Sequence, residues 1–124
     1  MNKDGKIFCK TELFNKHPNL LKKDSYFSIK RGWFSLVDSL CCELNEYIEN
    51  GEDNYNEDCY IIQLKEKFGK LRCYVTEDFQ TGEVLVTIDK YENNSIHICQ
   101  ECGDSSPEDV FETLCKNCRD SKRR

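Results

Sequence analysis

Two cysteine pairs constrain the fold of this 124-residue chain more than any other feature. Each pair has the spacing Cys-x-x-Cys, and the four residues are Cys99, Cys102, Cys115 and Cys118. A turn with this spacing aims two thiolates at one point, and two such turns are typical of a tetrahedral, four-cysteine zinc site. Gly103 follows the first pair, where a turn of this kind often needs a positive φ. We therefore expect structural Zn2+ in a zinc ribbon over residues 96–120.

Composition and charge restrict the setting in which the chain works. It has nine cysteines, an odd number, and a formal net charge of −5. No run approaches the roughly 20 apolar residues of a membrane span, and no apolar segment of a secretory signal follows Met1. We therefore expect no membrane partner, a reducing cytoplasm and no disulfide framework. The thiols outside the two pairs are Cys9, Cys41, Cys42, Cys59 and Cys73.

An amphipathic helix is predicted from Trp33. Apolar residues recur at the i, i+3, i+4, i+7 spacing of one helix face, at Trp33, Leu36, Val37, Leu40, Cys41, Leu44, Tyr47 and Ile48. Gly32 precedes this stripe, and Asn50-Gly51 is a signal for the end of the helix. Cys41 lies on the apolar side and is expected in the core, whereas Cys42 lies at its edge.

A β-hairpin is predicted after the helix. Residues 59–65 and 71–75 alternate between apolar and polar side chains, and Gly69 lies in the turn between them. The apolar face of the first strand is expected to carry Tyr60, Ile62 and Leu64. The thiols of the hairpin, Cys59 and Cys73, are expected in the core.

Two segments are harder to assign. Residues 84–95 begin with strand propensity but also fit one helix face. Residues 1–31 show no clear period, and we expect a solvated arm that packs a few apolar residues on the domain. The predicted fold is a small α+β domain. Its parts are an N-terminal arm 1–31, a helix and β-hairpin core 32–95, the zinc ribbon 96–120 and a basic tail 121–124.

No catalytic constellation is recognisable in the sequence. The two histidines are His17, beside Pro18, and His97, two residues before Cys99. A Ser-His-Asp or Cys-His nucleophile needs a positioned histidine, and neither sequence context predicts one. A zinc ion with four thiolates is coordinatively closed and has no position for an activated water. We therefore expect no enzymatic activity.

Two classes of binding partner remain open. The hairpin interleaves basic and aromatic residues, a pattern that suits phosphates and stacked bases. The candidates are Lys65, Lys67, Lys70, Arg72 and Tyr74. The loop before the hairpin is acidic, a pattern that suits a basic protein partner, and its candidates are Glu52, Asp53, Glu57 and Asp58. Because the acidic total charge opposes a polyanion, a protein partner is the first expectation and nucleic acid the alternative.

Three features occur together in residues 32–118: Gly32-Trp33 opening a helix, the hairpin segment Gln63-x-Lys-Glu-Lys-Phe-Gly-x-Leu-Arg-x-Tyr74, and the two Cys-x-x-Cys pairs. In these features the chain resembles a family of small phage and prophage proteins. The resemblance implies helix rather than strand for residues 84–95, and a bacterial host cell as the location. It supplies no activity, but small phage accessory proteins often bind host proteins, including defence systems.

The expected function combines these observations. We expect a zinc-binding accessory protein that binds a host or phage protein. One such role is that of an anti-CRISPR-like inhibitor of a bacterial defence nuclease. The alternative is a zinc-ribbon protein that binds nucleic acid and regulates transcription or replication.

Metal analysis tests the predicted ribbon. The purified protein should contain about one zinc ion per chain if the four cysteines form one site. Cys102→Ser should lower the stability far more than Cys42→Ser, because only the first substitution opens a closed metal site. Atomic absorption and thermal unfolding measure the two effects. A folded protein that holds no metal would contradict the prediction.

Overall fold

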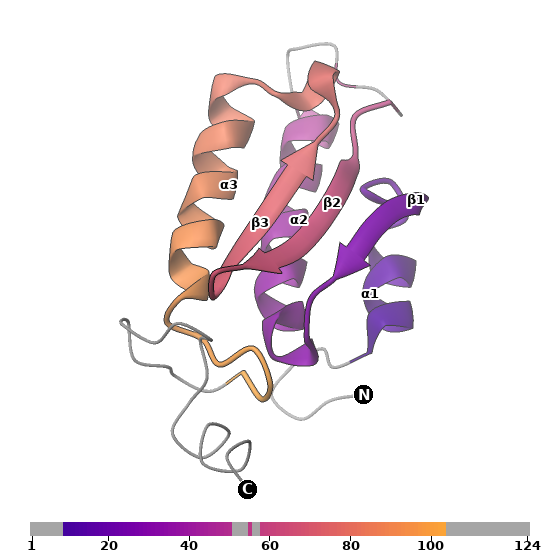
Figure 1. Ribbon diagram of the computed structural model, residues 1–124. Coiled ribbons are helices and arrows are strands. Elements are labelled where there is room, and N and C mark those ends of the chain that lie inside the picture. Colours follow the sequence, from indigo (N-terminus) through magenta and orange to yellow (C-terminus); the bar gives the residue numbers. More distant parts are fainter. Residues whose placement is uncertain (1–8, 51–54, 56–57, 104–124) are drawn as a thin grey trace, which may run out of the picture.

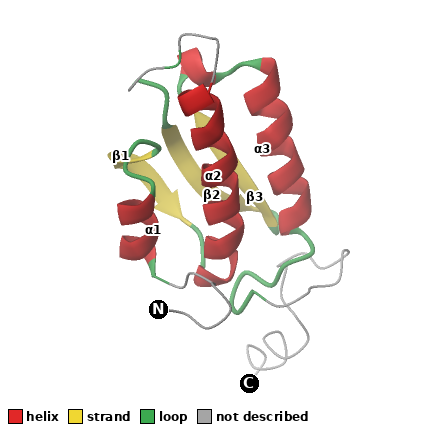
Figure 2. Cartoon of the chain, turned by 180° about the vertical axis from the view of Figure 1, so that it is seen from behind, coloured by secondary structure: helices red, strands yellow, loops and turns green. Residues whose placement is uncertain are grey.

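A three-stranded sheet with the strand order β1-β2-β3 organises the fold. The computed structural model describes residues 9–50, 55 and 58–103 (Figure 1). The strands are β1 (Leu21–Ser28), β2 (Ile61–Lys67) and β3 (Lys70–Val75). β1 pairs parallel with β2, and β2 pairs antiparallel with β3. The helices α1, α2 and α3 all lie on the same side of this sheet (Figure 2), so the protein is a small α+β domain.

The predicted amphipathic helix is confirmed as α2 (Phe34–Asn50), which follows a short 3-10 turn at Arg31–Trp33. Its apolar stripe faces the sheet and buries Phe34, Val37, Leu40, Cys41 and Leu44. Cys41 is fully buried, whereas Cys42 is exposed, as the helical period predicts. The apolar spacing of the sequence therefore determines how α2 covers the sheet.

The ambiguous segment before the cysteine pairs is a helix, α3 (Gly82–Ser95). Val84, Thr87 and Ile88 are buried at helical spacing, so the helical period prevails over strand propensity. The Tyr47 hydroxyl of α2 lies 2.7 Å from the Thr87 hydroxyl of α3, which joins the two helices. In the described parts of the chain, no helix is both long enough and apolar enough to cross a bilayer.

The segment before Gly32 belongs to the fold, and the prediction of a solvated arm is wrong for its described residues, 9–31. α1 (Lys10–Lys16) packs Leu13 fully into the core, and Leu20, the residue before β1, is also fully buried. The Phe27 ring of β1 packs edge-on against Phe14 of α1 and Phe34 of α2. Parallel pairing of β1 with β2 joins residues far apart in the sequence, so no local pattern reveals it.

The predicted hairpin is confirmed, with a two-residue turn at Phe68 and Gly69. Both residues have positive φ, 54° and 78°, which matches the type I′ geometry of short hairpins. The predicted apolar face is wrong in one respect, because the register shifts between Ile61 and Gln63. This irregularity buries Ile61 and Leu64 and leaves Ile62 39% exposed.

Side chains from the helix layer cover the outer edge of β3. Ser95 Oγ accepts from the Leu71 N–H at 2.9 Å, and a carboxylate oxygen of Glu92 accepts from the Cys73 N–H at 2.9 Å. The Gln80 amide, which follows a 3-10 turn at Glu77–Phe79, donates to the Val75 carbonyl at 3.1 Å. These contacts occupy the backbone groups with which a further strand would pair.

Truncation of Leu20 tests whether the N-terminal segment is part of the core. Leu20→Ala should lower the free energy of unfolding by about 2–5 kcal/mol, because it opens a cavity at a fully buried position. Val86→Ala is the matched control: Val86 is 72% exposed, so the change should stay within about 0.5 kcal/mol. Urea unfolding measures both, and equal effects would show that residues 9–31 do not pack as described.

Candidate functional site

The first cysteine pair forms a tight turn after α3. The Gly103 N–H donates to the Cys99 carbonyl at 2.8 Å, and Gly103 has a φ of +86°, as the sequence predicts. The Cys99 side chain is buried and Cys102 is partly exposed. This turn is compatible with a pair of zinc ligands, since the backbone of the Cys-x-x-Cys segment is closed on itself. The second pair, Cys115 and Cys118, lies outside the described residues.

The residues before α2 bind this turn to the core. The Trp33 indole N–H donates to the Ile98 carbonyl at 2.8 Å, and Trp33 is fully buried. The Gly32 N–H donates to the Gln100 carbonyl at 2.9 Å. A Cβ added at Gly32 would lie only 2.2 Å from the Cys99 carbonyl oxygen, so the turn and the start of α2 are in backbone contact. Gly32-Trp33 therefore positions the first cysteine pair.

The face of the sheet opposite the helices is basic and aromatic. We define the basic sheet face as Tyr26, Lys65, Lys67, Lys70, Arg72 and Tyr74. The register places these side chains in rows, because Gln63 pairs with both Tyr26 and Tyr74, Lys65 with Arg72, and Lys67 with Lys70. The buried residues of β3 alternate with these positions and face the helices. All five hairpin residues predicted as a nucleic-acid site thus share one face.

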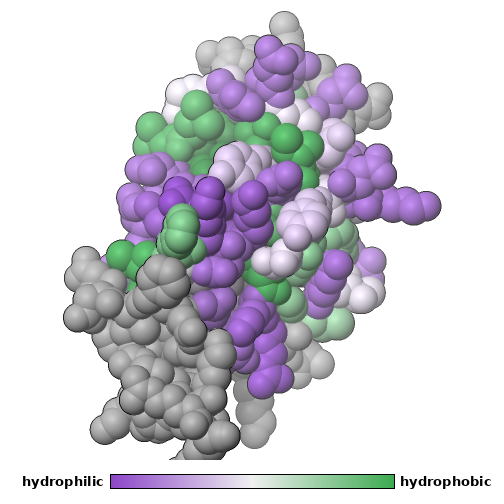
Figure 3. Space-filling model, viewed as in Figure 1, coloured by the Kyte–Doolittle hydropathy of each residue, from purple (hydrophilic) through white to green (hydrophobic). Residues whose placement is uncertain are grey.

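The cations of the basic sheet face are not paired with acids. Lys65, Lys67, Lys70 and Arg72 form no ion pair with any described carboxylate, whereas Lys16, Lys30 and Lys90 elsewhere do. The Lys65 ammonium lies 5.6 Å from the centre of the Tyr74 ring, on the same face. Tyr26 is 54% exposed and Tyr74 is 44% exposed. In Figure 3 hydrophilic side chains extend across the middle of this side of the molecule.

Charge is separated between the two layers of the domain. The three strands contain six basic and two acidic residues, a net charge of +4. α2 and α3 contain seven acidic residues and one basic residue, a net charge of −6. The sheet lies between these two helices and the basic sheet face, so the acidic residues of α2 and α3 are turned away from that face (Figures 1 and 2).

The predicted acidic partner site lies mostly outside the described residues. Glu52, Asp53 and Glu57 are among the residues that the structure does not describe, and Asp58 is exposed just before β2. Tyr55, between them, packs its ring edge-on against Phe79. Its hydroxyl lies 2.7 Å from the hydroxyl of Thr81 and from a carboxylate oxygen of Glu83.

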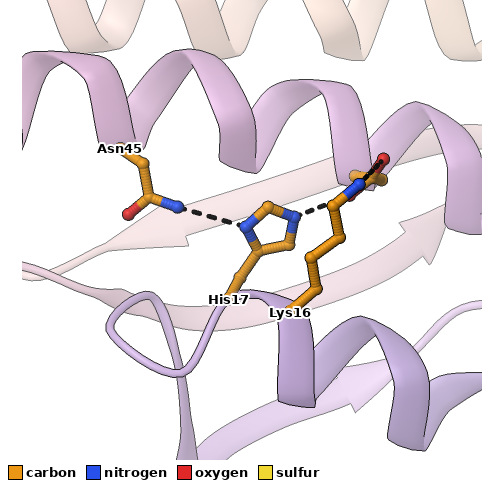
Figure 4. A network of polar contacts seen from close by, with 4 residues as sticks. Lys16, His17 and Asn45 are labelled. Carbon is orange, nitrogen blue, oxygen red and sulfur yellow. Dashed lines mark hydrogen bonds and ion pairs between the residues drawn. The ribbon is translucent and has the colours of Figure 1, made fainter.

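A buried polar network that the sequence did not predict joins α1 to α2. His17 is 3% exposed, and its Nε2 lies 2.6 Å from Asp38 Oδ1. Its other ring nitrogen, Nδ1, lies 3.1 Å from the Asn45 amide nitrogen, and Lys16 Nζ lies 3.0 Å from Asp38 Oδ2. Figure 4 shows the His17 ring held between the two helices. Asp38, Cys42 and Asn45 follow one helical stripe, which is the signal that sequence reasoning missed.

The thiols outside the cysteine pairs differ in burial: Cys41, Cys59 and Cys73 are buried, and Cys42 is exposed. Burial raises the pKa of Cys41 and of Cys73 above the ordinary thiol value, and Cys59 is buried as well. Partial burial, and then the negative charge of Asp38, raise the pKa of Cys42. The raised pKa values favour the protonated thiol at Cys41, Cys42 and Cys73. Both ring nitrogens of the nearby His17 are engaged by Asp38 and Asn45. The arrangement is not that of an activated cysteine nucleophile.

Comparison with known proteins finds no matching family model, no matching curated protein and no matching solved structure.

Substitution of Gly32 tests the backbone contact between α2 and the cysteine turn. Gly32→Ala places a methyl group against the Cys99 carbonyl and must displace the turn, so we expect a loss of about 1–3 kcal/mol in unfolding free energy. Gly82→Ala is the matched control, because nothing lies within 4 Å of its added Cβ. Urea unfolding compares the two variants. If Gly32→Ala were as stable as the control, the described contact would not exist.

Proposed function

We propose that the protein is a binding module whose basic sheet face binds single-stranded nucleic acid. The observation that carries the proposal is the charge separation between layers. The net negative charge of the chain opposes polyanion binding most strongly where acidic residues share a face with the cations. The acidic residues of α2 and α3 do not share the basic sheet face, because they lie in the opposite layer. A phosphate backbone at the basic sheet face would meet four cations that no described carboxylate neutralises.

The aromatic row favours a single strand over a duplex. Tyr26 and Tyr74 lie in one row, one strand apart on either side of Gln63, and both are exposed. Two strand spacings separate them, or about 10 Å. Unpaired bases could stack on such rings while phosphates approach the neighbouring row of Lys65 and Arg72. The paired bases of a duplex do not offer their faces for stacking on these rings, whereas the bases of a single strand do.

We also propose that Cys99, Cys102, Cys115 and Cys118 hold one structural Zn2+. Support comes from the spacing of the two pairs and from the closed turn at the first pair. Bound to four thiolates, the ion would supply a cross-link and no chemistry. Gly32 and Trp33 would then connect the metal to the start of α2. In this proposal the protein binds its target and catalyses no reaction.

A second candidate function is the binding of a basic host or phage protein by the acidic helix layer. α2 carries four acidic residues and no basic one, and Glu46 and Glu49 are exposed. Asp58 adds a further exposed acid before β2. A protein with a nucleic-acid channel, such as a bacterial defence nuclease, offers the complementary charge. This reading retains the inhibitor role that the resemblance to phage proteins implies.

Fluorescence anisotropy with labelled single-stranded DNA and RNA tests the first proposal. Tyr74→Ala should raise the dissociation constant by an amount equivalent to about 1–3 kcal/mol, because one stacking platform is lost. Lys65→Ala should weaken binding to all sequences and reduce the slope of log K against log salt by about 0.7, because one phosphate contact is lost.

Lys90→Ala is the matched control for charge, since Lys90 lies on α3 and is paired with Glu43. It should leave the affinity and the salt slope unchanged. Absence of binding to any oligonucleotide at physiological salt would refute the nucleic-acid proposal. An affinity pull-down from nuclease-treated bacterial lysate then tests the second candidate. The wild-type protein should retain a partner, and the double variant Glu46→Lys/Glu49→Lys, which reverses two charges, should not retain it.

A further inference from the structure

His17, Asp38 and Cys42 form a cluster of metal-ligand side chains that shares no residue with the basic sheet face or with the cysteine pairs. One ligand atom from each residue lies within 4.8 Å of the other two. His17 is buried, Asp38 is 15% exposed, and Cys42 is exposed on the outside of the cluster. We propose that these three residues form a second metal site, which binds a divalent transition-metal ion such as Zn2+.

The donor set selects the class of metal. Imidazole nitrogen, carboxylate oxygen and thiolate sulfur together suit zinc, whereas Mg2+ and Ca2+ prefer oxygen ligands alone. Tetrahedral coordination at zinc distances places ligand atoms about 3.3–3.8 Å apart. The 2.6 Å contact between His17 and Asp38 must therefore widen, and the exposed Cys42 side chain has room to turn inward. Three protein ligands leave the fourth position for water.

The backbone fixes the two sides of the site before any metal binds. Asp38 and Cys42 are four residues apart on α2, so their side chains lie one above the other on one helix face. On the α1 side, the His17 N–H donates to the Leu13 carbonyl at 3.2 Å. The His17 carbonyl accepts from the N–H groups of Leu20 and Leu21 at 3.1 and 2.9 Å. The imidazole is therefore presented from a fixed turn.

The neighbours of the cluster are placed to orient its ligands. The Asn45 amide nitrogen lies 3.1 Å from Nδ1 of His17. If a metal binds Nε2, Nδ1 is the ring nitrogen that does not coordinate it. With metal bound, Nδ1 carries the ring proton and donates it to the Asn45 side-chain oxygen, which requires the amide to turn over. Lys16 holds Oδ2 of Asp38, so Asp38 would bind the metal through Oδ1 alone.

Metal binding at this site displaces the proton of the Cys42 thiol, which passes to solvent as the sulfur–zinc bond forms. If the network had a purely structural role, the contacts of His17 with Asp38 and Asn45 would be enough, and Cys42 would not be needed. Substitution of Cys42 therefore distinguishes a metal site from a structural network.

Native mass spectrometry of the full chain under reducing conditions, with zinc added alone, tests the proposal. The wild type should gain about one further zinc ion beyond those retained after dialysis. Cys42→Ala should not gain it, and Asn45→Ala should need about 10- to 100-fold more zinc. Cys9→Ala, which removes an exposed thiol elsewhere, is the matched control and should behave as the wild type.

Site-specific alkylation gives a second readout. In the wild type, bound zinc should slow the alkylation of Cys42 by iodoacetamide. In the Asp38→Asn variant, added zinc should leave the rate of this alkylation unchanged. A wild type that gains no ion in excess zinc would overturn the proposal, as would a Cys42→Ala variant that gains one. Because the gain is compared within one series, the result does not depend on whether the C-terminal cysteine pairs hold metal. Cys42 is exposed, so its substitution leaves the fold intact.

Discussion

The one-sided covering of the sheet is the constraint on which the rest of the structure depends. The three-stranded sheet has two faces, and α1, α2 and α3 all pack on the same face (Figure 2). The apolar side chains of every element must converge on that layer, because only there can they leave water. The other face must then carry polar side chains, and here they are mainly Lys, Arg and Tyr. Among the described residues, a polar outer sheet face follows from this packing, and its basic character comes from the lysines and the arginine of β2 and β3.

Local patterns predicted much of the fold, and non-local pairing accounts for what they missed. The apolar stripe of α2 and the Gly69 turn of the hairpin are signals within a single element, and both are confirmed. The helix at residues 84–95 needed the resemblance to phage proteins to decide between two local signals. The pairing of β1 was missed because its partner β2 lies across an intervening helix, and parallel pairing leaves no mark on a short window of sequence.

The candidate sites divide in the same way. Alternation along β3 was enough to place Arg72 and Tyr74 on a common face, and the φ of Gly103 followed from the cysteine spacing. The network around His17 was missed because its partner Asp38 lies 21 residues away on another helix. The charge of the whole chain averages two layers of opposite sign that the fold keeps apart, so it does not describe either surface.

The central claim is that the sheet and the helix layer present different surfaces, and that the sheet surface binds. Nuclear magnetic resonance of the isotope-labelled protein, titrated with a short single-stranded oligonucleotide, tests it most directly. Amide signals of β2 and β3 should shift in proportion to the bound fraction, while those on the outer side of α2 stay in place. Shifts confined to α2 and α3, or no shift at physiological salt, would contradict the claim.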